Sequence, residues 1–123
     1  MDSRLFPFPR GAMIAESESG RLLLGPFCGK PACQFINTSP GRGVCADAYL
    51  RRKTLVVEDV HKYPGHIACD GDTKSEIVCP LIQDDGEVLG VFDLDCRAVG
   101  AFDSDDQFGL ENICKLVVSA CDW

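Results

Sequence analysis

The sequence lacks several patterns that would place it in a common class of protein. It has no basic run longer than Arg51-Arg52-Lys53, and its formal net charge is −7. Clustered cations carry the affinity of proteins for the phosphate backbone, so the sequence argues against nucleic-acid binding. Its N-terminus has no apolar run long enough for a signal peptide or a membrane span. We therefore expect neither a nucleic-acid nor a membrane partner, and a cytoplasmic location.

The eight cysteines lack the spacing of a zinc site. No Cys-x-x-Cys pair occurs, and only His61 and His66 are available as imidazole ligands, so no metal is expected. A disulfide scaffold is typical of secreted chains, whereas this sequence shows no secretion signal and has apolar strands that supply a core. Most of the thiols are therefore expected to be small buried hydrophobic side chains.

The 123 residues contain no internal repeat and predict a single domain over residues 1–123. Residues 1–11 mix prolines and phenylalanines without a period, which indicates a tail or an edge segment. Two strands are predicted over residues 12–15 and 21–24, joined as a hairpin whose second strand ends at Gly25-Pro26. A third short strand, over residues 32–36, contains Cys33.

The middle of the chain predicts a helix, a strand and a long loop. Turn residues before Val44 open into a helix over residues 44–52, with Cys45 near its start. Unpaired backbone amides there favour an anion, either a thiolate or a carboxylate of a ligand. A strand over residues 54–57 follows, and then a loop over residues 58–74. A loop of that length inside a compact domain is usually functional or disordered.

The best-defined unit is a hairpin of two strands, residues 76–82 and 88–95. A two-residue turn at Asp85-Gly86 sets Glu76 opposite Asp95 and Val78 opposite Asp93. Asp93 and Asp95 share a face in any register, whereas a bulge at Gly86 would move Glu76 to the other face. The sequence therefore predicts three carboxylates, those of Glu76, Asp93 and Asp95, on one side of the sheet.

The C-terminal part predicts a helix that starts at a capping box, Ser104-Asp105-Asp106-Gln107. Apolar residues at spacings of three and four give this helix a stripe that packs on the sheet. The stripe consists of Leu110, Ile113, Leu116, Val117 and Ala120. Several strands, a mid-chain helix and a closing helix indicate an α+β domain with a mainly antiparallel sheet.

Cys69 is the candidate redox nucleophile. It lies in a glycine-bounded loop three residues after His66, where an imidazolium can stabilise a thiolate. An ordinary buried or surface thiol is the alternative. Cys33 and Cys45 are candidates for a second thiol, because a sulfenic acid condenses with a neighbouring thiol to form a disulfide. For Cys33, in an apolar strand, the alternative is a core side chain.

Glu76, Asp93 and Asp95 are the candidate ligand-binding residues. The run Val91-Phe92-Asp93-Leu94-Asp95 places charges where core residues are expected, so these groups need a partner or a ligand. A solvated strand end is the alternative. Clustered carboxylates can bind an ammonium group, and one that its neighbours keep protonated can donate a proton to a ligand oxygen. Arg42 is a candidate for a ligand carboxylate, with a surface arginine as the alternative.

An ordered set of motifs resembles the free methionine-(R)-sulfoxide reductases, a family of enzymes built on the GAF fold. The set covers roughly residues 22–118 and includes three family cysteines, which separates this family from GAF domains that only sense nucleotides or pigments. The motifs are LGPFCGKPAC (24–33), GRGVC (41–45), EDVH (58–61), PGHIACD (64–70), SEIVCPL (75–81) and GVFDLD (90–95).

The resemblance implies a role for each of three thiols. Cys69 would attack the sulfur of free methionine-R-sulfoxide, release methionine and be left as a sulfenic acid. Cys33 would then close a disulfide, with Cys45 as the alternative resolving thiol, and a thioredoxin-type protein would reduce that disulfide.

The resemblance also implies roles for the acids and a fold. Glu76, Asp93 and Asp95 would hold the substrate ammonium and assist proton delivery to the sulfoxide oxygen. No metal or organic cofactor is implied. The family fold is a six-stranded antiparallel sheet with helices on both sides, commonly found as a homodimer.

The sequence also departs from the family pattern. The N-terminal region is shortened, and Pro9-Arg10-Gly11-Ala12-Met13 stands where the family has an Asn-Trp-x-Gly-Phe-Tyr strand whose tryptophan lines the pocket. Cys28, Cys79 and Cys96 are extra thiols that could compete as resolving groups or form mixed disulfides. The alternative function is a catalytically impaired GAF-type module that binds a small ligand or senses redox state.

Overall fold

The computed structural model describes residues 10–16, 21–28, 35–65 and 72–121. Within these ranges the strands form one antiparallel sheet of six strands in the order β3-β2-β1-β6-β5-β4. The elements in chain order are β1 (Arg10–Glu16), β2 (Arg21–Cys28), β3 (Phe35–Asn37), α1 (Val44–Arg51), β4 (Leu55–Val57), a 3-10 turn η1 (Val60–Lys62), β5 (Ser75–Ile82), β6 (Val88–Cys96) and α2 (Ser104–Ala120).

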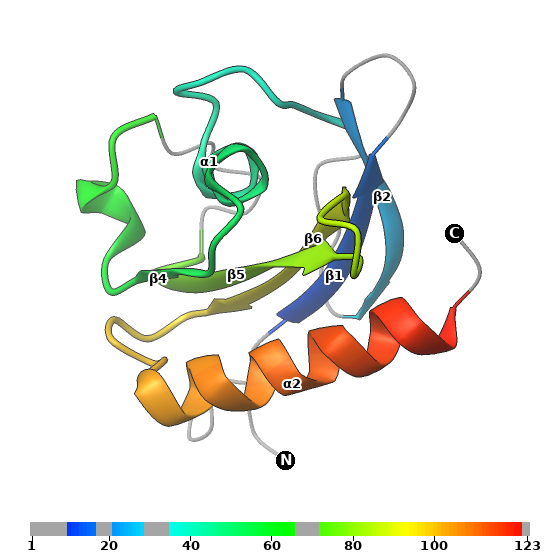
Figure 1. Cartoon of the computed structure of the whole chain (residues 1–123). Helices are drawn as coiled ribbons and strands as arrows, with labels where there is room; N and C mark the ends of the chain where they lie inside the picture. The colour runs from blue at the N-terminus through cyan, green and yellow to red at the C-terminus, as the bar shows by residue number, and fades with distance from the viewer. Residues whose placement is uncertain (1–9, 17–20, 29–34, 66–71, 122–123) are drawn as a thin grey trace.

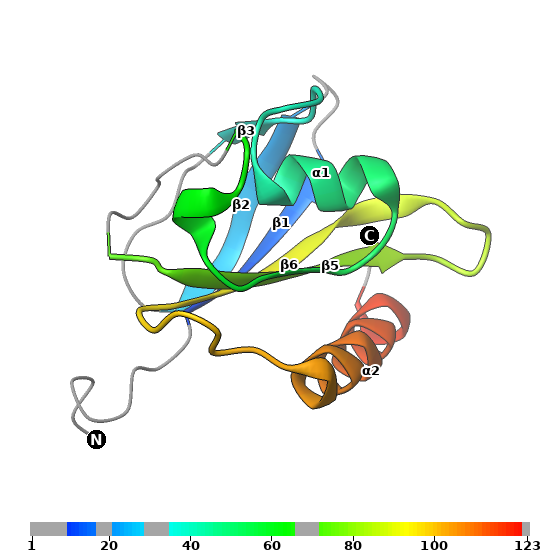
Figure 2. The same cartoon turned by 90° about the vertical axis from the view of Figure 1, so that its left-hand side faces the viewer.

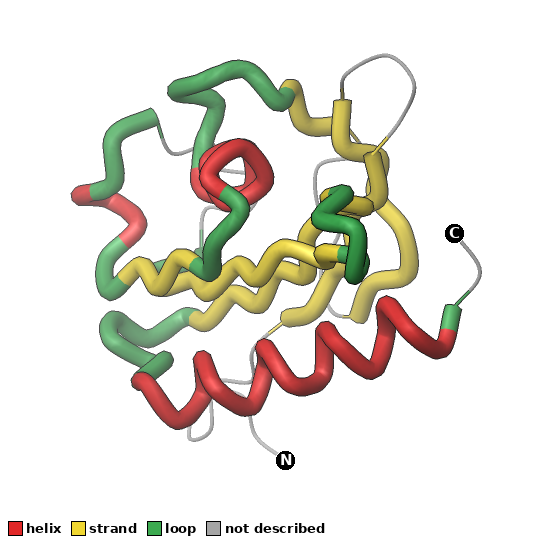
Figure 3. Tube along the Cα trace, in the orientation of Figure 1, coloured by secondary structure: helices red, strands yellow, loops and turns green. Residues whose placement is uncertain are grey.

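The two helices cover opposite faces of the sheet. Helix α1 and the turn η1 lie on one side, and α2 runs along the other (Figures 1 and 2). Figure 3 shows that the loops before and after α1 lie on the same side as that helix. The predicted α+β fold, with an antiparallel sheet between helices, is confirmed.

Strand β1 lies inside the sheet, which corrects the prediction for part of the N-terminal segment. Residues 10 and 11 were expected in a tail or edge segment, but Arg10 pairs with Asp95, and Gly11 pairs with both Cys28 and Leu94. A short run such as Arg10-Gly11-Ala12 carries no periodic apolar signal of its own, and its two neighbouring strands fix its place. Residues 1–9 lie outside the described residues.

Strand β2 does not end at Gly25-Pro26, as the sequence predicted, but continues to Cys28. Between Ala12 and Ile14 of β1 the partner on β2 changes from Phe27 to Leu24, so β2 has one extra residue there. This irregularity coincides with Gly25-Pro26. A proline has no N–H to give to a ladder, and a bulge is one of the few places inside a sheet that accept it.

The predicted facing pairs of the β5–β6 hairpin are confirmed. Glu76 lies opposite Asp95, and Val78 lies opposite Asp93. The predicted two-residue turn at Asp85-Gly86 is wrong, because the loop contains three residues, Asp84-Asp85-Gly86. The N–H of Gly86 donates to the oxygen of Gln83 at 2.9 Å, and Gly86 has a positive φ of 90°. A three-residue loop with glycine at the left-handed position is a common hairpin connection.

A second irregularity in the same hairpin restores the predicted register. Ile82 pairs with Val88, whereas Leu81 pairs with Gly90, so Leu89 is the extra residue on β6. The longer turn shifts the pairing by one residue, and the extra residue shifts it back. Glu76 consequently stays on the same face as the two aspartates.

Both helices begin where the sequence predicted. Helix α1 ends one residue early, because Arg52 takes a left-handed conformation with φ of 59°. The capping box of α2 is centred one residue earlier than predicted, on Asp103. Its Oδ1 accepts from the N–H of Asp106 at 2.9 Å, and Asp106 Oδ2 accepts from the N–H of Asp103 at 2.9 Å. Aspartate and serine are equally good N-cap residues. The two reciprocal hydrogen bonds between Asp103 and Asp106 make Asp103, rather than Ser104, the N-cap of α2.

The core divides into two apolar clusters, one on each face of the sheet. Alternate residues of β5 supply them, with Val78 on the α1 side and Ile77, Cys79 and Leu81 on the α2 side. The expectation of buried thiols holds for four of the five cysteines whose exposure is described, since only Cys121 is exposed. The cluster on the α1 side contains Leu22, Ile36, Val44, Cys45, Ala46, Ala48, Val57, Val60, Val78 and Val91.

The buried face of α2 differs from the predicted stripe. Leu110 and Cys114 are buried against the sheet, and Val117 is half-buried beside them, whereas Ile113 is 50% exposed and Leu116 is 69% exposed. The helix is therefore rotated relative to the prediction, with Cys114 in the position expected of an aliphatic side chain. No helix in the described part of the chain is both long enough and apolar enough to span a bilayer.

We predict that the two leucines of α2 differ sharply in their effect on stability. Leu110→Ala should lower the free energy of unfolding by about 2–5 kcal/mol, because it leaves a cavity under the helix. Leu116→Ala is the matched control on the exposed face and should cost less than about 1 kcal/mol. Denaturant unfolding of both variants measures the difference, and equal losses would contradict the observed rotation of α2.

Candidate active site

Four of the predicted site residues come together on the α1 face of the sheet. Glu76 comes from β5, Asp93 and Asp95 come from β6, and Cys45 is the second residue of α1. The sulfur of Cys45, a carboxylate oxygen of Glu76 and one of Asp93 all lie within 4.8 Å of one another. Cys33 and Cys69, the two other predicted thiols, lie outside the described residues.

Glu76 is buried among like charges. It is 6% exposed and has side-chain hydrogen bonds with both Asp93 and Asp95. Burial, followed by the charge and the hydrogen bond of Asp93, raises the pKa of Glu76 well above its ordinary value, and Asp95 adds to this. Adjacent carboxylates in a buried site do not all ionise readily. Glu76 therefore keeps its proton to higher pH than an ordinary glutamate and can donate it.

The surroundings of Cys45 favour the thiol over the thiolate, which was one of the two anions expected at the start of α1. Burial raises its pKa well above the ordinary value, and the charges of Asp93, Glu76 and Asp95 raise it further. The helix terminus stabilises an anion by at most about 2 kcal/mol, whereas burial and like charges can shift a pKa by several units. The acids therefore outweigh the backbone amides.

The same groups are the candidate metal ligands among the described residues. Cys45, Glu76 and Asp93 each offer one ligand atom at the separations given above. A metal ion needs the thiolate form of cysteine, however, and the surroundings of Cys45 favour the protonated thiol. The cluster is better suited to hold a proton and a small organic cation than a metal ion.

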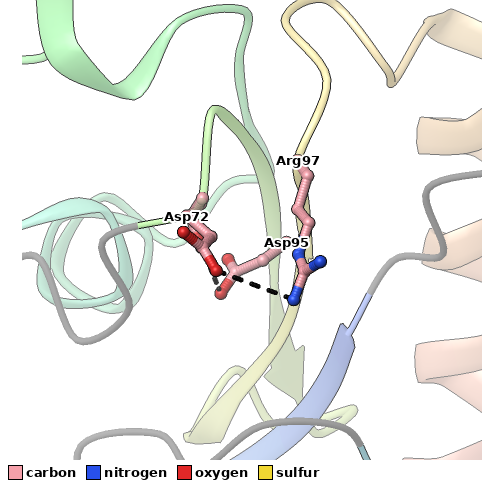
Figure 4. A network of polar contacts seen from close by, with 4 residues as sticks. Asp72, Asp95 and Arg97 are labelled. Atoms are coloured by element: carbon pink, nitrogen blue, oxygen red, sulfur yellow. Dashed lines mark hydrogen bonds and ion pairs between the residues drawn. The ribbon is translucent and has the colours of Figure 1, made fainter. Parts of the chain in front are cut away.

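The wall of the site beside Asp95 comes from the residues just before β5. Thr73 is buried, and its hydroxyl donates to Asp95 Oδ2 at 3.4 Å. Next to it, Asp72 forms an ion pair of 3.6 Å with Arg97, the residue that follows β6 (Figure 4). An exposed pair of this kind adds little to stability. The pair lies where the chain enters β5.

Both described ends of the predicted loop are held close to the site. At one end, Gly65 has φ of +75°, and a Cβ placed on it would lie 2.5 Å from the backbone oxygen of Gly41, in the turn before α1. At the other end, the N–H of Lys74 donates to the oxygen of Cys96 at 2.8 Å. The intervening residues 66–71, which include Cys69, lie outside the described residues.

Tyr63 is a site residue that sequence reasoning missed. It lies in the loop after η1, and its hydroxyl donates to Asp47 Oδ2 in α1 at 2.5 Å. Burial, with the Asp47 hydrogen bond next in size, raises the pKa of Tyr63 to about 12. The bond ties the loop to the helix that carries Cys45. An aromatic residue with a polar tip two residues before Gly65 was the available signal.

Comparison with known proteins gives a consistent picture. A family model described as GAF domain matches residues 4–122. Over 105 residues the chain is 53% identical to the free methionine-R-sulfoxide reductase of Saccharomyces cerevisiae, covering 85% of this chain and 57% of that protein. Over 96 residues it is 44% identical to the enzyme of the same name from Escherichia coli, covering 78% of this chain and 56% of that protein. The chain thus spans less than three fifths of the length of these curated relatives.

A solved structure extends the comparison to three dimensions. The structure of free methionine-R-sulfoxide reductase from Neisseria meningitidis in complex with its substrate superimposes with a TM-score of 0.84 at 38% sequence identity. The match covers 95% of this chain and 69% of that one.

We predict that Glu76 gives the protein a stability that falls as pH rises. Its pKa is raised in the folded state, so its contribution is fully present below the unfolded pKa of about 4.3 and is lost as pH rises through the folded pKa. Between these two pKa values, Glu76 is ionised in the unfolded chain but still protonated in the folded protein. Glu76→Gln removes this titration, so its free energy of unfolding should fall with pH less steeply than that of the wild type, by up to about 1 kcal/mol per pH unit.

Denaturant unfolding at a series of pH values measures this effect. Glu87→Gln, at the exposed end of the β5–β6 hairpin, is the matched control for loss of one charge and should follow the wild-type curve. Parallel curves for the wild type and Glu76→Gln would show that Glu76 is ionised in the folded protein.

Proposed function

Since the chain belongs to the GAF domain family and, within it, to the free methionine-R-sulfoxide reductases, we propose that it reduces free L-methionine-(R)-S-oxide to L-methionine. The observation that carries this proposal is the cluster of buried Glu76 with half-buried Asp93 and Asp95 beside the start of α1. The substrate combines an ammonium group with a sulfoxide oxygen that must receive a proton, and one site supplies both negative charge and an acid.

The acids divide these tasks according to their surroundings. Asp93 and Asp95 hold the ammonium group by charge, as clustered carboxylates do. Glu76 keeps its proton because burial and the two aspartates raise its pKa, so it is the general acid for the sulfoxide oxygen. Arrival of the ammonium cation lowers the cost of ionising Glu76, and proton transfer therefore becomes easier once substrate is bound.

Cys69 supplies the sulfur that is oxidised. It precedes Asp72 by three residues, so their α-carbons are at most roughly 11 Å apart in any conformation. Asp72 is next to Thr73, which donates to Asp95. This short connection in sequence supports the assignment of Cys69 as the attacking thiol. Its sulfur attacks the sulfoxide sulfur, the oxygen is transferred, and methionine leaves as Cys69 becomes a sulfenic acid.

Cys33 completes the cycle in preference to Cys45. A resolving thiol attacks as its thiolate, and the pKa of Cys45 is raised by burial and by the three acids. Cys33 attacks the sulfur of Cys69, water leaves, and the resulting disulfide is reduced by the dithiol of a thioredoxin-type protein. Neither a metal nor an organic cofactor takes part in these steps. A homodimer remains a prediction from the family resemblance, and a cytoplasmic location remains a prediction from the sequence.

A ligand-binding module without turnover is the second candidate function. The carboxylates of Glu76, Asp93 and Asp95 would hold a small amino acid equally well in either case. What separates the two functions is the release of methionine, which needs an oxidisable thiol as well as the acids. The experiments below therefore measure product and binding together.

We predict that the wild type consumes free methionine-R-sulfoxide when supplied with a thiol reductant, and that Cys69→Ser lowers the rate by at least ~10³-fold because a hydroxyl cannot accept the oxygen. Chromatographic quantification of methionine measures the rate, and calorimetry measures binding. Cys121→Ser is the matched control, since Cys121 is exposed on the end of α2, and it should retain activity. Full activity in Cys69→Ser would disprove the mechanism, and wild-type binding without methionine release would favour the binding module.

We predict that the two candidate resolving thiols behave differently. Cys33→Ser should block turnover with thioredoxin and leave one equivalent of methionine per chain, because the sulfenic acid then has no rapid partner. Cys45→Ser should retain most thioredoxin-dependent turnover, because its thiol is rarely ionised. Single-turnover assays and a peptide map of the oxidised protein measure both effects. The reverse pattern would assign the resolving role to Cys45.

A further inference from the structure

Two cysteines outside the site described above lie together on the opposite face of the sheet. Cys79 is on β5 and Cys114 is on α2, and each is 3% exposed. They belong to the same apolar cluster. In the reduced protein the Cys79 thiol donates to the backbone oxygen of Pro80 at 3.6 Å. The proposed reduction of methionine sulfoxide uses neither of them.

The two thiols also line the same small cavity. Its volume is ≈ 170 Å³, enough for a few molecules the size of water, which takes about 30 Å³ in the liquid. The cavity therefore has room for a small oxidant beside the two thiols. Charged side chains in its lining make it polar in part, and these are Arg52, Lys53, Glu111 and Lys115.

The surroundings give the two thiols different acidities. A hydrogen bond from Cys114, together with one from Thr54, lowers the pKa of Cys79 although burial opposes the shift. The same hydrogen bond, with burial next in size, raises the pKa of Cys114. Cys79 thus ionises more readily than Cys114, which keeps its proton. Thiolates of low pKa are the ones that react with small oxidants.

We propose that Cys79 and Cys114 form a second redox-active dithiol, which a hydroperoxide such as hydrogen peroxide oxidises to a disulfide between β5 and α2. The juxtaposition of the two sulfurs in a cavity of that size carries the proposal. The site is a modification site on the α2 face, separate from the acids on the α1 face.

The chemistry takes place in two balanced steps. The Cys79 thiolate attacks one peroxide oxygen, the O–O bond breaks, and the other oxygen takes a proton and leaves as water. Cys79 is then a sulfenic acid. Oxidation removes the Cys79 thiolate, whose hydrogen bond and charge raise the pKa of Cys114, so Cys114 then ionises more readily. Its sulfur attacks the Cys79 sulfur, the S–O bond breaks, and a second water leaves with the Cys114 proton. Two thiols lose two electrons in total, and hydrogen peroxide gains them.

The test is a peptide map of the full-length protein. Reduced wild type is treated with hydrogen peroxide, its remaining thiols are blocked by alkylation, and the digest is analysed by mass spectrometry without reduction. We expect a Cys79–Cys114 linked peptide. In Cys114→Ser, Cys79 should instead stop at the sulfenic acid, which a 1,3-dione reagent traps. Cys121→Ser is the control and should form the linked peptide as the wild type does.

A second measurement does not depend on any variant. The disulfide closes a loop of about 35 residues, so oxidised wild type should melt roughly 5–15 °C above the reduced protein, and a dithiol reductant should reverse the shift. Recovery of Cys79 and Cys114 only as alkylated peptides, or joined to other cysteines, while exposed Cys121 is oxidised, would overturn the proposal. An unchanged melting temperature in protein that carries no Cys79–Cys114 link would overturn it equally.

Discussion

The site depends on three carboxyl groups that share one face of two paired strands. A buried carboxylate without a partner costs several kcal/mol. Keeping the group protonated instead costs about 1.4 kcal/mol for each unit by which the pH exceeds the ordinary pKa of a carboxyl group. Burial and the neighbouring Asp93 and Asp95 raise the pKa of Glu76, so the packing of these groups favours a glutamate that keeps its proton. Burial raises the pKa of Cys45, and the same carboxyl groups raise it further, so the acidity of Glu76 and the reactivity of this thiol are linked.

That arrangement rests on a register that two irregularities preserve. The three-residue turn closed by Gly86 and the extra residue at Leu89 each shift the pairing by one, in opposite directions. Either one alone would turn Glu76 toward α2 and separate it from the aspartates, because side chains alternate along a strand. The turn of the hairpin, far along the strands from the acids, thus decides whether the acids meet.

Local chemistry explains what the sequence could predict. Alternation along residues 76–95 predicted the hairpin pairs, although the turn is one residue longer than predicted and an extra residue on β6 restores the register. Turn residues and acids predicted where the two helices start, and charges at core positions of β6 predicted the cluster of Glu76, Asp93 and Asp95. What it missed was set by distant partners: the inner position of β1, the passage of β2 through Pro26 and the rotation of α2. The site contacts of Tyr63 and Thr73 join residues 16 and 22 apart in sequence, beyond the range of local patterns.

The two faces of β5 give two thiols opposite character. Burial raises the pKa of a thiol, and both Cys45 and Cys79 are buried, yet only Cys45 has a raised pKa. The difference lies in their neighbours, because three carboxyl groups add to the effect of burial at Cys45, whereas the side chains of Cys114 and Thr54 lower the pKa of Cys79 against burial and the charge of Glu111. Glu76 and Cys79 are three residues apart on one strand and so face opposite sides. If Cys79 lay on the face that carries Glu76, the carboxyl groups would raise its pKa, as they do for Cys45. The alternation of side chains along β5 therefore allows a proton-donating site on one face and an oxidisable dithiol on the other.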